Sequence, residues 1–302
     1  MKKFSLLIFS LLVITSVLNS QQLPLYSQYM MNGFLLNPGI TGSVEYIPVR
    51  LTVREQWTGI TDAPSTQALS THALLSNKHI GVGGYIFNDK FGPISSTGIQ
   101  ASFAYHISLD ENNKLGLGLA LSAFQFSLDE SNLEAIEDND IALTGAVEST
   151  FVPDANFGAY LYSDKYFIGL SGVQLIQYKI KLHEQLAGNN QMIRHYYATA
   201  GYTITVSEDF DIQPSLLAKG TEKTPAQIDF NAKAIYKKNY WLGVSYRSCK
   251  SLIAIIGIKY DRYYIGYAFD YTFSPLKNYS NGSHEFMIGV NIGGNKTGSS
   301  LL

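Results

Sequence analysis

Strict alternation of apolar residues with polar residues or glycine is the feature that most restricts how this chain can fold. In residues 194–206, tyrosine, alanine, isoleucine and valine occupy every even position from 196 onward, and mostly threonine, tyrosine and glycine lie between them. Period-two alternation places one kind of side chain on each face of a β-strand. The pattern recurs at residues 114–121, 227–236, 262–273 and 285–292, and helical periodicity is nowhere sustained. The sequence therefore predicts an all-β protein.

Strand length then separates the possible β folds. Globular strands average ~5–6 residues, whereas a strand tilted across a bilayer needs ~9–11 residues. A soluble β-sandwich would explain the alternation but not the length. An even number of long antiparallel strands with one apolar face is typical of outer-membrane barrels, which close because lipid offers no partner for an unpaired edge. We expect a transmembrane antiparallel β-barrel of about 14 strands, at residues 48–56, 66–74, 79–88, 94–108, 113–127, 154–163, 165–175, 194–206, 209–219, 226–237, 240–248, 251–260, 262–273 and 284–293.

The connections between these strands alternate in length, which predicts the orientation of the barrel. Residues 128–153 and 176–193 form long links, whereas the intervening links, such as residues 207–208, are short. Outer-membrane barrels have long extracellular loops and short periplasmic turns. The link at residues 248–250 is short and departs from the rule once.

The N-terminus carries the pattern of an export signal. Lys2 and Lys3 precede an apolar run, residues 4–18, and Ser20 offers a small residue for cleavage. A transmembrane anchor is the alternative, but the run is shorter than the ~20 residues that a spanning helix needs. The expected organisation is therefore as follows: a signal peptide at 1–20, a periplasmic N-terminal segment at 21–47, an outer-membrane β-barrel at 48–293 and a C-terminal tail at 294–302. The N-terminal segment could alternatively plug the lumen.

Composition excludes several classes of function. Charged residues make up 15% of the chain and the formal net charge is −2, so the chain has no basic field for nucleic acid. Cys249 is the single cysteine, which excludes a disulfide framework and a cysteine-based metal cluster. We assign no catalytic, cofactor-binding or metal-binding residue and expect no enzymatic activity.

Two patterns in the sequence are candidate sites. His106 and Ser108 share a strand face, as the dyad of an outer-membrane phospholipase would require, but any His-x-Ser in a strand satisfies this pattern and the pair should lie at the periplasmic end. The loop at residues 128–153 is rich in carboxylates, which calcium favours, yet it lacks the spacing of an EF-hand. A solvated extracellular loop is the preferred interpretation.

Glycines and charged residues of the strands have structural interpretations. Gly81-x-Gly83-Gly84 and Gly116-x-Gly118 do not open helices, so they are not phosphate loops, and we expect them to leave room for inward side chains. Charges of both signs are expected inside the barrel, where mutual pairing is preferred over a selective pore. These inward polar residues are Arg50, Arg54, His72, Lys219, Asp229, Lys233, Lys259, Asp270 and Glu285.

Several stretches resemble one family in order along the chain. They are YSQYMMNGFLLNPGITGS (26–43), REQWTGITDAPSTQALSTHALL (54–75), IGVGGYIFNDKFGPISSTGI (80–99), PDANFGAYLYSDKYFIGLS (153–171), NYWLGVSYR (239–247) and IGYAFDYTFSPLKNYSNGSHEFMIGV (265–290). Together they resemble the PorP/SprF family of type IX secretion outer-membrane proteins. The matches at Tyr29, Asn37, Pro38, Trp57, Gly92 and Pro93 carry no assigned chemistry and are interpreted as structural or interface positions. The tail after residue 293 departs from barrels that end on an aromatic residue.

The resemblance implies a bacterial outer-membrane barrel that serves secretion, surface attachment or gliding motility. Its implied partners are outer-membrane lipid, a secreted adhesin or cargo protein with a C-terminal sorting domain, and type IX secretion or gliding components, some of them peptidoglycan-associated. A porin or substrate-specific channel is the alternative function, and an outer-membrane hydrolase is a third.

Overall fold

The computed structural model describes residues 23–24, 26–131, 145–180 and 191–293. The predicted signal peptide at 1–20 and tail at 294–302 lie outside the described residues, as do residues 132–144 of the acidic loop. No helix among the described residues is long and apolar enough to cross a membrane.

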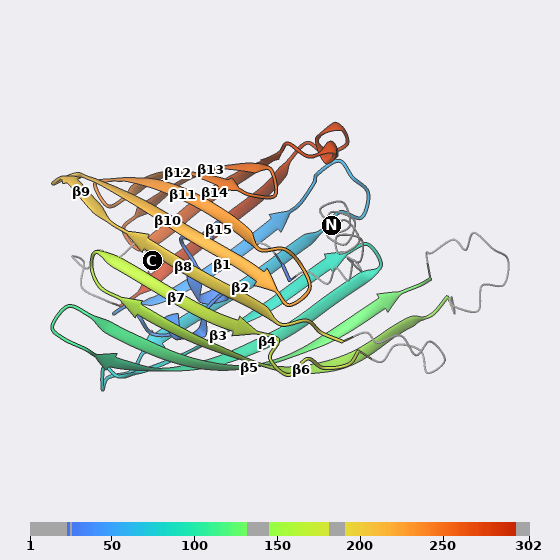
Figure 1. Cartoon of the computed structure of the whole chain (residues 1–302), viewed down its shortest axis with the longest axis horizontal. Coiled ribbons are helices and arrows are strands. Elements are labelled where there is room, and N and C mark those ends of the chain that lie inside the picture. Colours follow the sequence, from blue (N-terminus) through green and yellow to red (C-terminus); the bar gives the residue numbers. More distant parts are fainter. Residues whose placement is uncertain (1–22, 25, 132–144, 181–190, 294–302) are drawn as a thin grey trace, which may run out of the picture.

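One antiparallel sheet closes on itself to form a barrel (Figure 1). The strands pair in sequence order, except that β8 and β9 both pair with β10, and β1 pairs with β15 to complete the ring. The strands are β1 (Ile47–Glu55), β2 (Ser65–Leu74), β3 (Ile80–Phe91), β4 (Ile94–Ser108), β5 (Lys114–Asp129), β6 (Val147–Tyr162), β7 (Tyr166–Val173), β8 (His195–Tyr202), β9 (Ile204–Ser207), β10 (Phe210–Thr221), β11 (Gln227–Tyr236), β12 (Tyr240–Arg247), β13 (Ser251–Tyr260), β14 (Tyr263–Thr272) and β15 (Ser283–Ile292).

β8 and β9 both pair with β10 and are separated by Thr203 alone, so together they form one strand of the wall. The barrel therefore has fourteen strands around its circumference. This confirms the predicted architecture, and each predicted strand is present. The main difference in bounds is at β6, which begins at Val147 instead of residue 154. β5 and β6 consequently extend beyond their neighbours at the end of the barrel where the long connections gather (Figure 1). We refer to this end as the loop end and to the other as the turn end.

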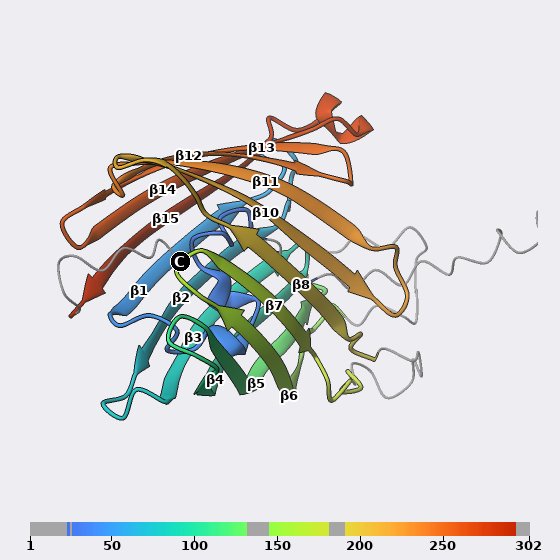
Figure 2. The same cartoon turned by 60° about the vertical axis from the view of Figure 1, so that its left-hand side comes forward.

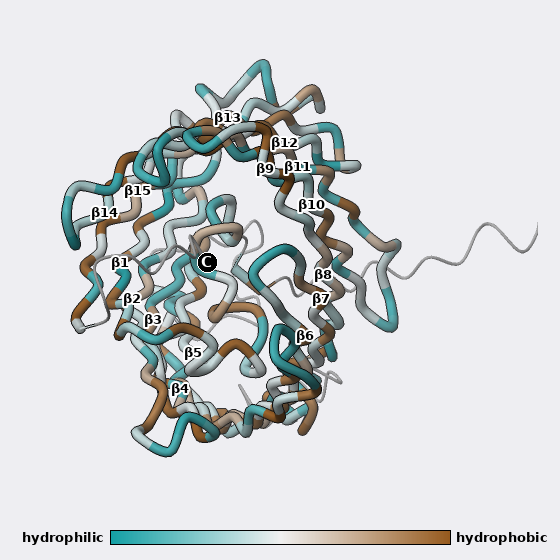
Figure 3. Tube along the Cα trace, turned by 90° about the vertical axis from the view of Figure 1, so that its left-hand side faces the viewer, coloured by the Kyte–Doolittle hydropathy of each residue, from teal (hydrophilic) through white to brown (hydrophobic). Residues whose placement is uncertain are grey.

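The two faces of the wall have the polarity expected of a barrel in lipid. Outward side chains are apolar and exposed, as at Leu119, Leu121 and Ile265, whereas inward polar groups such as Asp229 and Glu285 are completely buried. This is the reverse of a water-soluble protein. Figure 3 looks along the barrel and shows the ring of strands around an occupied interior.

A row of outward polar side chains marks one limit of the apolar band. Gln67, Asn88, Thr97 and Gln125 lie opposite one another on β2 to β5. The Asn88 amide donates to Gln67 Oε1 at 2.8 Å, and Thr97 Oγ1 donates to Asn88 Oδ1 at 2.7 Å. Toward the turn end, the outward positions of β5 are apolar over residues 115–123, which matches the ~9–11 residues of a bilayer-crossing strand. The polar row therefore lies at the membrane boundary nearest the loop end, and β5 and β6 project beyond it.

Candidate functional site

The interior of the barrel is occupied by the segment that precedes β1. Figure 2 shows this segment, in blue, inside the ring of strands. We call its described residues, 23–24 and 26–46, the plug. It contains two short 3-10 turns, η1 (Gly33–Leu35) and η2 (Pro38–Ile40). The sequence favoured a periplasmic placement for residues 21–47 and offered a lumen plug only as the alternative, whereas the described residues of this segment lie in the lumen.

The plug crosses the lumen from the loop end to the turn end. Leu23 and Pro24 line a cavity with Phe124 and Asp154 in the loop-end half of the wall. At its other end, Thr41 lies beside residues of the turn-end half, and the chain then enters β1. The segment therefore spans the interior before the first strand begins.

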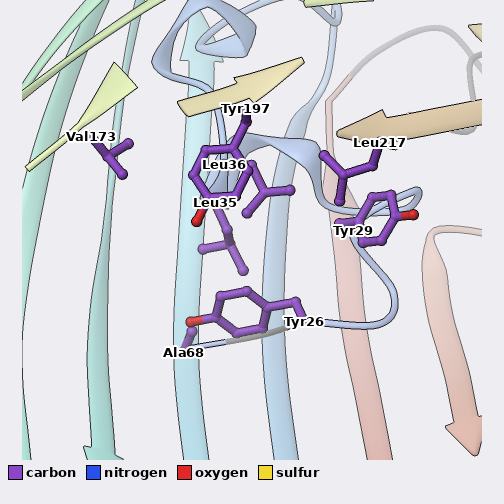
Figure 4. Close-up of a cluster of buried hydrophobic side chains, with 8 residues drawn as sticks. All are labelled: Tyr26, Tyr29, Leu35, Leu36, Ala68, Val173, Tyr197 and Leu217. Atoms are coloured by element: carbon purple, nitrogen blue, oxygen red, sulfur yellow. The ribbon is translucent and has the colours of Figure 1, made fainter. Parts of the chain in front are cut away.

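Apolar residues of the plug pack against inward apolar residues of the wall. Tyr26, Tyr29, Leu35 and Leu36 form one cluster with side chains from four strands of the wall (Figure 4); these are Ala68, Tyr197 and Leu217, and Val173 at the end of β7. The Tyr29 hydroxyl donates to Asn231 Oδ1 at 2.8 Å. Burial raises the pKa of the Tyr26 and Tyr29 phenols, so both stay protonated at neutral pH.

A buried ionic cluster fixes the plug near the loop end. Arg54 forms ion pairs with Asp270 (2.6 Å) and Glu285 (3.2 Å) and donates to Ser27 Oγ at 2.8 Å. Ser27 in turn donates its hydroxyl to Asp270 and its backbone N–H to Glu285 Oε2. The Gln28 backbone N–H donates to Glu285 Oε1 at 2.9 Å. The carboxylates of β14 and β15 are thus satisfied jointly by the wall and the plug.

Arg247 extends this cluster along the wall. It pairs with Asp229 at 3.0 Å and with Asp270 at 3.4 Å. Mutual pairing of inward charges was predicted from the sequence, and the ion pairs of Arg54, Asp229, Asp270 and Glu285 confirm it. Arg247 was missed in that prediction, although it continues the inward positions of β12 at which Ser245 and Trp241 are buried.

The plug backbone rests on glycines of the wall at the turn end. A Cβ atom on Gly116 or Gly118 would overlap the backbone at Pro38 and Gly39, and one on Gly81 would overlap the Thr41 carbonyl. These glycines do not make room for inward side chains, as their spacing had suggested. They make room for the main chain of the plug, because a backbone approaches a strand this closely only where no side chain intervenes.

We call these three glycines, Gly81, Gly116 and Gly118, the glycine floor. Asn37 holds the plug in place beside it. Its Oδ1 accepts the Gly39 backbone N–H at 2.8 Å, which caps η2, and its Nδ2 donates to the Ala159 carbonyl at 3.1 Å. Pro38 occupies the first position of η2, where its missing N–H is tolerated. Two positions that match the family motif therefore hold the plug against β6.

Two histidines hold the following residues. The Gly42 backbone N–H donates to His72 Nδ1 at 3.1 Å, and His106 Nε2 lies 2.8 Å from the Thr41 carbonyl. His106 Nδ1 is 3.0 Å from the Tyr162 hydroxyl. Both ring nitrogens of His106 are therefore engaged in positioning the plug, and Ser108 is exposed at the strand end. The structure brings His106 to Thr41 and Tyr162.

The connection between β7 and β8 folds over the inner face of the projecting strands. Ile180 and Met192 are buried against Phe124 of β5 and Val152 of β6. The Met192 backbone N–H donates to the Tyr178 carbonyl at 3.0 Å. These described parts of the connection cover the lumen on the side of β5 and β6.

The other positions singled out in the sequence lie in connections between strands or on the inner face of the wall. Trp57 and Gly92 adopt positive φ angles of 47° and 56° in loop-end connections. Pro93 follows Gly92 in the two-residue connection between β3 and β4. Cys249 is exposed in the β12–β13 turn. Lys259 lies over the Tyr264 ring, while the other predicted inward residues are buried, namely Arg50, Arg54, His72, Lys219, Asp229, Lys233, Asp270 and Glu285. Among the described residues, no group of three or more histidine, cysteine or acidic side chains could hold a metal ion.

Solved structures with a similar fold are barrels. The Ralstonia pickettii toluene transporter TbuX aligns with a TM-score of 0.52 at 10% identity, covering 87% of this chain and 93% of that one. A Pseudomonas aeruginosa FadL homologue gives a TM-score of 0.47 at 9% identity, covering 84% and 91%, and the KdgM porin gives 0.37 at 9% identity, covering 82% and 99%. No curated protein matches the chain.

The profile of one family spans nearly the whole chain. The family described as "Type IX secretion system membrane protein PorP/SprF" matches residues 18–290, which include the plug and all strands up to β15. Together with the closed barrel, this match identifies a protein of the bacterial outer membrane. The chain belongs to the PorP/SprF family of type IX secretion system membrane proteins.

Proposed function

We propose that this barrel is a non-enzymatic component of type IX secretion that supports the export or surface anchoring of a partner adhesin. The single observation that carries the proposal is the family match over residues 18–290. The occupied lumen favours it over a passive porin, because a porin conducts through a water-filled interior and here the plug fills that space. The proposed partners are a cargo protein with a C-terminal sorting domain and components of the secretion or gliding machinery, including peptidoglycan-associated ones.

Deletion of the barrel from its native cell tests this proposal. We expect one exported protein, or a small set, to disappear from the cell surface while other secreted proteins still emerge. Quantitative proteomics of surface-shaved peptides and culture medium provides the measurement. Re-expression of the full chain should restore the missing protein, and unchanged surface composition after deletion would contradict the proposal.

A gated channel is the second candidate function. The plug is held by non-covalent contacts, and an apolar cavity remains between it and the wall, lined by Leu36, Tyr160, Phe167 and Leu216 among others. TbuX, one barrel of similar fold, is a toluene transporter. Planar-bilayer recordings of the purified protein distinguish the two: transient openings favour a gated channel, and a complete absence of openings favours the anchoring function.

A further inference from the structure

The projecting half of β6 has one edge without a partner strand. β6 pairs with β5 along its full length, from Asp129↔Val147 to Lys114↔Tyr162. On its other side it pairs with β7 only between Phe157 and Tyr162. Within the described parts of the chain, no strand pairs with β6 on that side from Val147 to Asn156. The barrel is therefore notched between β6 and β7 at the loop end.

Hydrogen bonds at the two ends of this stretch show which backbone groups face the notch. The Ala146 carbonyl accepts from Glu130, the residue after β5, and the Ala155 carbonyl accepts from Leu175, the residue after β7. In an antiparallel strand the N–H and C=O of one residue point to the same side, and the side alternates along the chain. Because the β5–β6 register is continuous, the odd-numbered residues of β6 point into the notch.

The open part of the edge is short and defined. Near the membrane it is covered, because Ile176 donates its N–H to Asp154 and the chain then leaves the edge and crosses to the inner face. Pro153 has no N–H to offer, as is usual for proline in a sheet edge. Within the described residues, the open N–H donors of this edge are therefore those of Phe151, Ser149 and Val147.

The position of the open edge relative to the membrane determines what can bind to it. Phe151 lies opposite Gln125, the last member of the outward polar row. The open edge thus begins at the membrane boundary and rises from it, so lipid is not its neighbour. Unpaired backbone groups at an exposed edge are a template for another strand.

The two faces of the edge define the chemistry of that strand. Phe151 and Val147 point outward and are each 63% exposed, whereas Val152 on the opposite face is fully buried beneath Ile180 and Met192. An added strand would gain most by placing apolar side chains beside Phe151 and Val147. Strand addition gives affinity through main-chain hydrogen bonds and specificity through alternate side chains.

We propose that the open edge of β6 at Val147–Phe151 binds an extended segment of the exported partner protein, with apolar residues at alternate positions, as an additional antiparallel strand. The inference rests on the proposed function for the source of that segment. A second copy of the barrel fits less well. Copies inserted in the same membrane run β6 in the same direction and could pair only as parallel strands, which is the weaker arrangement.

Proline scanning of the edge tests the proposal. Ser149→Pro removes a notch-facing N–H and leaves the hydrogen bonds of β6 to β5 intact, and Ser149→Ala is the matched control that changes only the side chain. The probe is the purified C-terminal sorting domain of a secreted adhesin from the native cell, added to the full-length barrel in detergent. We expect Ser149→Pro to weaken its binding at least tenfold and Ser149→Ala to leave it within twofold. Heat-modifiable gel migration checks that both variants are folded.

Amide hydrogen exchange of the wild-type barrel provides a second measurement. The bound sorting domain should slow exchange at Val147, Ser149 and Phe151, with little change at the intervening residues that already bond to β5. Equal binding by both variants, or protection confined to other loops, would overturn the edge site and leave the proposed function standing. Protection that appears without the probe and rises with barrel concentration would assign the edge to a second copy. No binding, together with unchanged surface proteins after barrel deletion, would overturn the proposed function itself.

Discussion

Arg54 on β1 and Asp270 on β14 form an ion pair of 2.6 Å inside the barrel, and both side chains also contact Ser27 of the plug. The two strands are separated by β15, which contributes Glu285 to the same cluster. One guanidinium therefore joins three neighbouring strands to the segment that fills the lumen. Both partners of the pair are almost completely buried.

Replacement of Arg54 should strongly destabilise the barrel. Arg54→Ala leaves Asp270 and Glu285 short of a buried cation, and breaking such a pair typically costs about 3–5 kcal/mol. Arg262→Ala is the control, because Arg262 and Asp261 are both more than half exposed and surface pairs contribute about 0–1 kcal/mol. Urea unfolding in lipid vesicles, followed by tryptophan fluorescence, measures both. Equal shifts in the two variants would show that the cluster is not important for stability.

A methyl group on the glycine floor should displace the plug. The Cβ of Gly81→Ala would overlap the Thr41 carbonyl, and main chain cannot yield as a flexible side chain does. The control is Gly220→Ala, where the nearest atom to an added Cβ is 4.0 Å away. We expect Gly81→Ala to raise single-channel conductance in planar bilayers and Gly220→Ala to match the wild type. Identical traces from all three proteins would contradict the packing of the plug on the floor.

The sequence predicted the strands of the wall far better than the position of the plug in the lumen. Alternation assigns each strand residue to a face, so the inward position of Arg54 and the outward position of Ile204 both follow from parity. The plug has no such period. Its place depends on contacts between residues far apart in sequence, such as Ser27 with Asp270 and Asn37 with Ala159. The glycines at 116 and 118 signalled a close approach, but nothing local to them identified Pro38 and Gly39 as the partners. For the same reason, a His106–Ser108 pattern could not reveal that His106 is engaged by Thr41 and Tyr162.

The position of the membrane boundary predicts a sharp difference between two residues on the outward face of β5. Leu119 lies within the apolar stretch at 115–123, so Leu119→Arg should cost ~2–4 kcal/mol of folding free energy near the bilayer midplane. Gln125→Arg, at the polar row, should cost ~0–1 kcal/mol, as expected near an interface. Folding into liposomes across a urea series gives both values. A similar cost at the two sites would mean that the boundary lies elsewhere.

The alternation of long and short connections predicts which end faces the cell exterior. An epitope inserted near residue 139, in the connection between β5 and β6, should be labelled on intact cells. An epitope at Ser207, the last residue of β9 before the turn into β10, should be labelled only after the outer membrane is permeabilised. Flow cytometry with an antibody to the epitope measures both. The reverse result would invert the barrel and place the open edge of β6 in the periplasm.

Locking the plug in place should separate anchoring from transport. The Asn32 amide donates to Ser70 Oγ on β2 at 2.9 Å, so cysteines at these two positions lie within reach of a short, reducible thiol crosslinker. The background is Cys249→Ser, which removes the exposed native thiol. If the barrel anchors a partner at its loop end, surface display of that partner should be the same before and after crosslinking, because the lumen need not open. Loss of display on crosslinking and its recovery on reduction would instead require the plug to move, and would favour the gated channel.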